Sequence, residues 1–396
     1  MGQSKLKIWG SAFLPIILLI LLLLAFLKFG PLGVFKSSVA PIENVFIQEV
    51  IFSPEHIALD VINDGPETVT IAQALVNDAY WQFDMEPSDT LRPLESGKIY
   101  ISYPWLEGDF EKITLISRNG ITFEKEVEAA TITPTFNIFY LKTFVLLGIY
   151  VGVIPVLLGL MWFPFLKMLR GKWYSFLLSL TIGLLVFLGF DALAESFELI
   201  GSLPQAFNGI GILIIGFLLA VLTLSAVSYK TQKLTEEKGE HYRALVWAYL
   251  IALGIGLHNL GEGLAIGSAY AVGEIALGSL LVIGFMVHNV TEGVAIIAPL
   301  TRNKERIQNI LFHLILMGIL AGVPTIIGAL VGGFSYSAVF GVFFLAIGAG
   351  AIFDVAYDIL GQMAKDNWAS IYTVTNVLGF LTGLLIMYAT GFLVVG

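Results

Sequence analysis

The chain has 396 residues, of which 57% are hydrophobic and only 13% are charged, and its mean hydropathy is +0.85. Soluble globular chains carry about twice that share of charged residues, so much of this surface is expected to lie in lipid. The absence of cysteine excludes disulfides, thiolate metal sites and a cysteine nucleophile. The formal net charge of −9 comes with no basic face, which excludes nucleic acid as a partner.

An apolar, leucine-rich stretch over residues 12–27 follows two lysines near the N-terminus. This pattern is typical of a signal anchor or of a cleavable signal peptide. The best cleavage motif ends at Ala40, but Pro41 follows it, and proline after the scissile bond disfavours processing. We therefore predict an uncleaved signal-anchor helix within residues 1–30.

Residues 40–132 change in character and are predicted to form an all-β extracellular domain. Between residues 31 and 136 there are 17 Asp and Glu residues against 6 Lys and Arg, a net charge of −11. Short segments rich in β-branched and aromatic residues alternate with turn sequences such as Asn119-Gly120, and this spacing predicts an immunoglobulin-like sandwich. The predicted strands are Val45–Phe52, His56–Ile62, Thr68–Leu75, Lys98–Tyr103, Lys112–Ser117 and Thr122–Val127. Several roles are compatible with this acidic domain. It could recruit an unknown extracellular partner, contact the cell envelope, gather cations by its charge, or aid dimerisation. The simplest alternative is that the acidic surface only keeps the domain soluble.

Residues 136–396 are predicted to form a membrane all-α domain of eight spans, each long enough to cross a hydrocarbon core of about 30 Å. The spans lie near 138–162, 174–198, 205–228, 244–271, 275–299, 307–332, 336–361 and 370–394. Lys and Arg residues occur in alternate loops, and the loops between them have none. Because basic loops stay cytoplasmic, we predict a multi-pass protein of the cell membrane with a cytoplasmic N-terminus and an extracellular C-terminus.

Two adjacent spans carry the same polar motif in their apolar middle. The fourth reads His258-Asn259-Leu260-Gly261-Glu262-Gly263, and the fifth reads His288-Asn289-Val290-Thr291-Glu292-Gly293. His and Glu are four residues apart in each copy, so each pair shares one helical face. A very short loop makes the two helices antiparallel neighbours, and the four side chains can converge at one depth.

Imidazole nitrogens and carboxylate oxygens suit Zn²⁺ and similar cations such as Fe²⁺ and Mn²⁺. Two carboxylates and one divalent cation sum to zero charge, which favours ionised glutamates in a bilayer. A single His–Glu pair would be explained equally well as a hydrogen bond between helices, but two copies at matched depth favour a functional cluster.

The eight spans and the paired motif resemble the ZIP (Zrt/Irt-like) family of metal transporters, in its GufA-like branch. The resemblance covers roughly residues 138–396. It implies uptake of a divalent metal toward the cytosol, no cofactor, a homodimer, and a metal site in the bundle. The implied metal-site residues are His258, Asn259, Glu262, His288, Asn289 and Glu292.

The chain departs from the family pattern in three places. Gly261 and Thr291 stand where proline usually precedes each glutamate, which puts the kinked geometry of these helices in doubt. No acid accompanies Pro324 in the sixth span, where the family often has glutamate, so one strong metal site is favoured over two.

Other polar residues in the spans are candidates for a metal pathway. Asp191 resembles an entrance residue of the family, and Glu195 lies four residues beyond it, where it would equally be a solvated helix end. Asp354 and Asp358 are four residues apart, and Asp358 stands where the family tends to place an exit-path acid. His313 is either a pathway residue or a lone buried histidine.

We therefore expect a transporter of a divalent transition metal, Zn²⁺ first, that works by alternating access within the lipid bilayer. A metal-binding sensor without flux is the main alternative. An intramembrane metalloenzyme is disfavoured because neither motif has the His-Glu-x-x-His order of zinc hydrolases.

Overall fold

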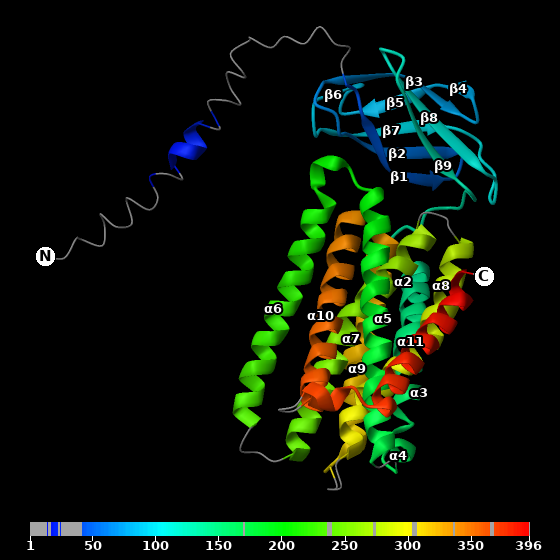
Figure 1. Cartoon of the computed structure of the whole chain (residues 1–396). Helices are drawn as coiled ribbons and strands as arrows, with labels where there is room; N and C mark the ends of the chain where they lie inside the picture. The colour runs from blue at the N-terminus through cyan, green and yellow to red at the C-terminus, as the bar shows by residue number, and fades with distance from the viewer. Residues whose placement is uncertain are drawn as a thin grey trace, which may run out of the picture. The chain divides into compact units, whose positions relative to one another are not determined.

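The computed structural model describes residues 14, 17–22, 24, 42–168, 171–235, 240–271, 275–302, 307–335, 337–364 and 368–395. The chain divides into two compact units, Met1–Ile42 and Glu43–Gly396. The predicted signal anchor of residues 1–30 lies outside the described residues, apart from residues 14, 17–22 and 24, which are helical. The second unit contains an all-β region and the helices α2 to α11 (Figure 1).

The all-β region is a sandwich of two antiparallel sheets. One sheet has the strand order β1-β2-β7-β5, and the other has β4-β3-β8-β9 with β6 paired to β3. The strands are β1 (Val45–Ser53), β2 (His56–Asn63), β3 (Val69–Val76), β4 (Ala79–Trp81), β5 (Phe83–Glu86), β6 (Thr90–Leu91), β7 (Ser96–Ser102), β8 (Glu111–Ser117) and β9 (Thr122–Val127). All six predicted strands are confirmed to within two residues, whereas an immunoglobulin-like topology stays a prediction.

Alternating burial along the strands builds the core of the sandwich. Ile57 and Leu59 of β2 and Ile99 and Ile101 of β7 are fully buried, and the residues between them face outward. The sequence prediction missed β4, β5 and β6 because they have at most four residues each. The chain leaves one sheet and joins the other at Gln82, so neither flanking strand is long enough to show a period of two.

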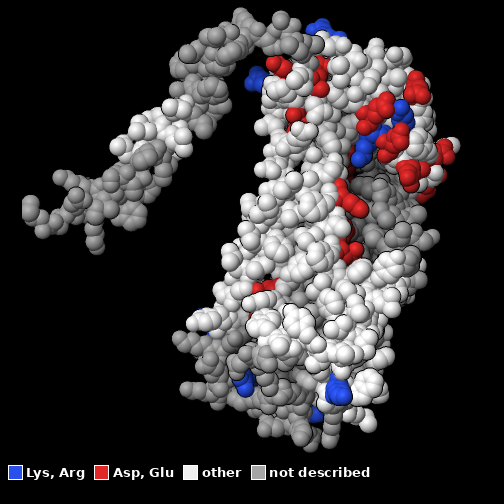
Figure 2. Space-filling model, in the orientation of Figure 1, with Lys and Arg blue, Asp and Glu red and all other residues white. Residues whose placement is uncertain are grey.

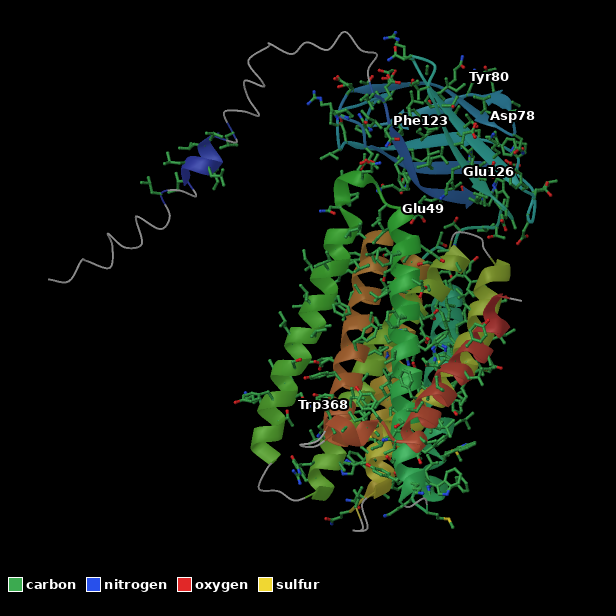
Figure 3. The ribbon with its side chains drawn as sticks, in the orientation of Figure 1. Glu49, Asp78, Tyr80, Phe123, Glu126 and Trp368 are labelled. Carbon is green, nitrogen blue, oxygen red and sulfur yellow. The ribbon has the colours of Figure 1, made fainter. Side chains whose placement is uncertain are left out.

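Glu49 of β1 is a partly buried acid on the sandwich (Figure 3). Burial raises its pKa, and the nearby carboxylate of Asp60 raises it further. Asp60 itself forms an ion pair with Lys98, with 3.2 Å between carboxylate oxygen and Nζ. Glu49 therefore binds a proton more readily in the folded protein than in the unfolded chain.

The helical region contains seven helical segments within the described residues that are long and apolar enough to cross a membrane. The first is built from α2 (Ile138–Gly148), the π-helical turn η1 (Ile149–Val153), α3 (Ile154–Leu160) and α4 (Phe163–Leu166). The others are α5 (Lys172–Gly201), α6 (Gly209–Thr235), α7 (Glu240–Ala271), α8 (Ile275–Ile297), α9 (Ile310–Phe334) and α10 (Ala338–Ala364). The predicted eighth span coincides with α11 (Val374–Val395), of which the shorter stretch Val374–Ala389 is apolar, so the count of eight stays a prediction.

Glycines allow the helices beside the motif to approach backbone to backbone. A Cβ on Gly293 of α8 would lie 2.3 Å from the Val156 carbonyl and 2.8 Å from the Cα of Gly159 in α3. A Cβ on Gly263 of α7 would lie 2.1 Å from the Thr325 carbonyl in α9. The glycine that follows each motif glutamate therefore fixes one neighbour, α3 for α8 and α9 for α7.

Charged side chains are distributed unevenly over this unit. Figure 2 shows acidic side chains over the strands and around α5, and basic side chains at the end of the helical bundle where α4 lies. Lys167 and Lys172, which flank the loop after α4, belong to that end. This distribution agrees with the predicted basic loops, while the orientation in the membrane stays a prediction.

Candidate metal centre

The two motif copies lie on α7 and α8, in the middle of long apolar helices. Because His and Glu are four residues apart, each pair shares one face of its helix. His258 Nε2 is 3.3 Å from Glu262 Oε1, and His288 Nε2 is 3.8 Å from Glu292 Oε1. The expected pairing within each helix is therefore present in the structure.

The two pairs also meet across the helix interface. His288 Nε2 lies 2.8 Å from Glu262 Oε1, and the rings of His258 and His288 are nearly parallel, with centroids 6.2 Å apart. One ligand-type atom from each of the four residues lies within 4.8 Å of the other three. All four residues are at most 6% exposed. The structure thus brings together His258, Glu262, His288 and Glu292 in one buried cluster.

The two asparagines of the motif are fully buried behind this cluster. Asn259 Nδ2 donates to the Ala321 carbonyl of α9 over 3.1 Å. Asn289 Nδ2 donates to the Val151 carbonyl of η1 over 3.1 Å and to Glu262 Oε2 over 3.0 Å. These bonds fix the amide orientation, since a flipped amide would place an oxygen against another oxygen.

Several buried polar atoms of the motif have no hydrogen-bond partner in the protein. They include His258 Nδ1, Asn259 Oδ1, Asn289 Oδ1 and Glu292 Oε2. Orphaned buried acceptors are rare in folded proteins because each costs about 1–3 kcal/mol. The imidazole nitrogens and carboxylate oxygens that converge in this buried cluster fit the donor set of a divalent transition-metal cation.

Two further acids lie on α5 beside the cluster. Glu195 is partly buried and interacts electrostatically with Glu262 and His288, and Asp191 interacts electrostatically with His288. Asp191 itself is exposed. Glu195 is therefore partly buried and within electrostatic range of the cluster, whereas a pathway role for Asp191 and Glu195 stays a prediction.

The acids of α10 face α6 instead of the cluster. The Ser225 hydroxyl donates to Asp354, and Ser228 Oγ donates to Asp358 Oδ2 over 2.5 Å. Asp354 is only 7% exposed. Gly348, earlier on the same helix, packs against the Cα of His258, so Asp354 lies about 9 Å farther along α10. The sequence analysis did not anticipate the two serines.

His313 of α9 is bound to a tyrosine. Its Nδ1 lies 2.8 Å from the Tyr249 hydroxyl of α7, and the two rings meet edge to face. His313 lies eight residues before Ala321, which is about 12 Å along the helix. It is therefore outside the four-residue cluster, and a pathway role for it stays a prediction.

Thr325 occupies the place beside Pro324 where the family resemblance would put an acid. It is fully buried, and its Oγ1 has no hydrogen-bond partner. It packs against Gly152 of η1, because a Cβ on that glycine would lie 2.2 Å from Thr325 Oγ1. No carboxylate comes from α9 to extend the cluster, so the single strong site expected from the sequence remains the better interpretation.

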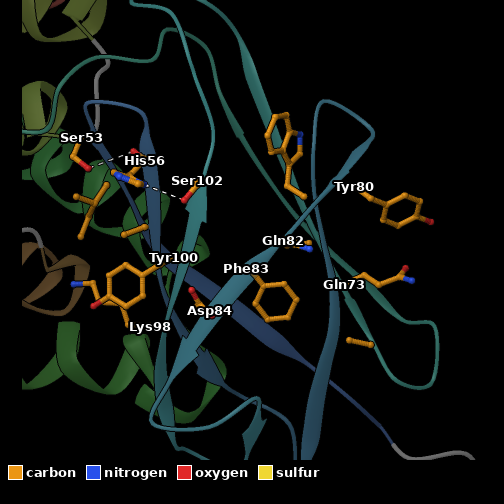
Figure 4. A pocket seen from close by; sticks show the side chains of 15 residues that line it. Ser53, His56, Gln73, Tyr80, Gln82, Phe83, Asp84, Lys98, Tyr100 and Ser102 are labelled. Carbon is orange, nitrogen blue, oxygen red and sulfur yellow. Dashed lines mark hydrogen bonds between the residues drawn. The ribbon is translucent and has the colours of Figure 1, made fainter.

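The β-sandwich carries a shallow groove that does not resemble the buried cluster. Figure 4 shows His56, Tyr100 and Lys98 on one side of this groove and Tyr80 and Gln73 on the other. His56 Nδ1 lies 3.3 Å from Ser102 Oγ. Within the described residues, the His and acidic side chains that meet as potential metal ligands are those of α7 and α8.

Comparisons with known proteins give no family. No family model matches the chain, and no curated protein matches it. Among solved structures, the archaellum periplasmic stator protein FlaG from Sulfolobus acidocaldarius is similar at 18% identity over 22% of this chain and 99% of that chain, with a TM-score of 0.20.

Proposed function

We propose that this protein is a divalent-metal transporter of the ZIP type, which carries Zn²⁺ or a similar cation across a membrane through the cluster on α7 and α8. The observation that carries the proposal is the meeting of four buried ligand-type side chains from two neighbouring apolar helices, with donor atoms within 4.8 Å of one another. Buried carboxylates without a cation or a proton are costly in a bilayer. A cation that binds in the cluster would offset this free-energy cost by neutralising the carboxylates for as long as it stays bound.

The donor set supports a borderline cation as the substrate. Two imidazoles and two carboxylates offer mixed nitrogen and oxygen ligands, which suit Zn²⁺, Fe²⁺ and Mn²⁺ better than Ca²⁺ or Mg²⁺. Glu262 and Glu292 together balance the charge of one divalent cation. A neutral complex of this kind lowers the barrier to moving an ion through a low-dielectric bundle.

The proposed route enters past α5 and leaves along α10. Asp191 is exposed and Glu195 is partly buried, and both interact electrostatically with the cluster, so these two acids would attract a cation toward it. Asp354 and Asp358 would receive it on the far side, after α10 or α6 moves to open their serine contacts. The basic loops predict that Asp191 lies toward the outer side of the membrane, and the direction of transport toward the cytosol is what the family resemblance implies. The homodimer and the extracellular partner remain predictions.

Uptake of radioactive Zn²⁺ and Fe²⁺ into proteoliposomes tests the proposal. The wild type would be compared with a Glu262→Ala/Glu292→Ala double variant, which removes both carboxylates of the cluster. The matched control is Glu107→Ala/Glu128→Ala, which removes the same charge from exposed positions of the β-sandwich.

We expect flux in the wild type and the control, and none in the cluster variant. Metal binding without flux in the wild type would refute transport and would favour a sensor. Equal flux in the cluster variant would refute this site as the pathway.

A further inference from the structure

Asn289 joins three parts of the helical bundle through one side chain. It belongs to α8, and both hydrogens of its amide are used, one on Glu262 Oε2 of α7 and one on the Val151 carbonyl of η1. The side chain is fully buried, so water does not compete for these bonds. The position of Glu262 therefore depends on a carbonyl in a third helix.

Pro155 deprives that carbonyl of its usual helical donor. In a regular α-helix the N–H of residue 155 would bond to the carbonyl of residue 151, but proline has no N–H. The preceding turn is also irregular, since Ile149–Val153 is π-helical and the Ile154 N–H bonds to the Ile149 carbonyl. The Val151 carbonyl is thus left without its usual helical partner, and it accepts from Asn289 instead.

The bond to Oε2 turns the other carboxylate oxygen of Glu262 toward the imidazoles. Oε1 lies 2.8 Å from His288 Nε2 and 3.3 Å from His258 Nε2. Without the amide, the carboxylate would be free to rotate about its terminal torsion, which has a broad energy minimum. Groups that orient metal ligands in this way typically change metal affinity by about 10–100-fold when they are removed.

We infer that Pro155 is a positioning residue of the metal site, acting through the Val151 carbonyl and the Asn289 amide on the carboxylate of Glu262. The inference rests on the proposed function only in taking the cluster as a metal site, and it does not require flux. An N–H at position 155 would compete with Asn289 for the Val151 carbonyl and would loosen Glu262.

A proline in the interior of α9 offers a matched control. Pro324 lies inside α9 and frees the carbonyl of Leu320, which packs against Gly256 of α7. Asn259 donates to Ala321 instead, which is not the carbonyl that Pro324 frees. Replacing Pro324 should therefore change the helix backbone in a similar way without releasing either motif asparagine.

The experiment measures Co²⁺ binding to the purified full-length protein in detergent, by visible absorption and by competition with Zn²⁺. Co²⁺ is the probe because its absorption spectrum reports the ligand geometry. The variants are Pro155→Ala, Pro155→Val (which keeps the number of side-chain carbons of proline), Pro324→Ala, Asn289→Ala and the double variant Pro155→Ala/Asn289→Ala. Circular dichroism of the metal-free proteins identifies any variant that has not folded.

We expect Pro155→Ala and Pro155→Val to weaken Co²⁺ binding by about 10–100-fold and to alter its spectrum. Pro324→Ala should stay within about twofold of the wild type. The double variant should match Asn289→Ala, because two residues that act through one contact are not additive.

Equal losses of Co²⁺ affinity in Pro155→Ala and Pro324→Ala would overturn the inference. Additive losses of affinity in the double variant would also overturn it. Unchanged affinity in both Pro155 variants would overturn it while leaving the proposed transport intact. Absence of flux with the expected binding pattern would instead refute transport and leave the role of Pro155 standing.

Discussion

A close helix contact beside the cluster, between α8 and α3, is tested by Gly293→Ala. The new Cβ would lie 2.3 Å from the Val156 carbonyl and 2.8 Å from the Cα of Gly159, whereas ordinary contact begins near 3.4 Å. Both obstacles are backbone atoms, so no side-chain rotation relieves the clash. Helices α3 and α8 must separate by about 1 Å, as the difference between these distances requires.

This separation reaches the metal site through Asn289. Its Nδ2 is 3.1 Å from the Val151 carbonyl, and an added 1 Å takes the pair to about 4 Å, beyond hydrogen-bond range. Overpacking costs about 1–3 kcal/mol, and the lost hydrogen bond adds about 1 kcal/mol. The gain in helix propensity from glycine to alanine returns about 1 kcal/mol. We expect the free energy of unfolding to fall by about 1–3 kcal/mol and metal affinity to fall by about tenfold or more.

The assay combines SDS-induced unfolding of the purified protein with Zn²⁺ affinity. Gly361→Ala in α10 is the matched control, because a Cβ there has nothing within 4 Å, so its stability should be unchanged or higher by up to about 1 kcal/mol. The reasoning about backbone contact fails if Gly293→Ala keeps both wild-type stability and wild-type affinity. It also fails if Gly293→Ala and Gly361→Ala lower the free energy of unfolding by the same amount.

Three further predictions concern other polar groups. Replacing Ser225 by alanine leaves the buried carboxylate of Asp354 without its hydroxyl donor, so SDS unfolding should show a loss of about 1–3 kcal/mol, with Ser225→Thr much closer to wild type. Tyr249→Phe removes the bond to His313 and should lower the free energy of unfolding by about 0.5–1.5 kcal/mol with Zn²⁺ affinity unchanged; a clear fall in affinity would place this pair in the site after all. Because burial raises the pKa of Glu49, its contribution to stability is greatest below the unfolded pKa of about 4.5 and is lost as pH rises through the folded pKa. Glu49→Gln should therefore slow hydrogen exchange of β1 and β2 at pH 7 in the full-length protein but have little effect near pH 4. An equal effect at both pH values would contradict a raised pKa for Glu49.

The sequence by itself determined most of the secondary-structure elements and the four side chains of the buried cluster. Long apolar runs set most of the membrane helices, because a lipid core leaves few alternatives for a chain of that length and polarity. The spacing of His and Glu on a helix follows from 3.6 residues per turn, so each half of the cluster could be read from its own segment. The short loop between the two motif helices then predicted their meeting, which the 2.8 Å approach of His288 to Glu262 confirms.

What the sequence did not determine depends on contacts between distant segments. The partner of Asn289 is a carbonyl 138 residues away, and the serines that bind Asp354 and Asp358 are 129 and 130 residues away. A proline in an apolar run signals a carbonyl without its helical partner, but not which side chain will reach it. That choice is made by close packing of the helices, where glycines let backbones approach and each buried donor must find an acceptor from whichever element lies beside it.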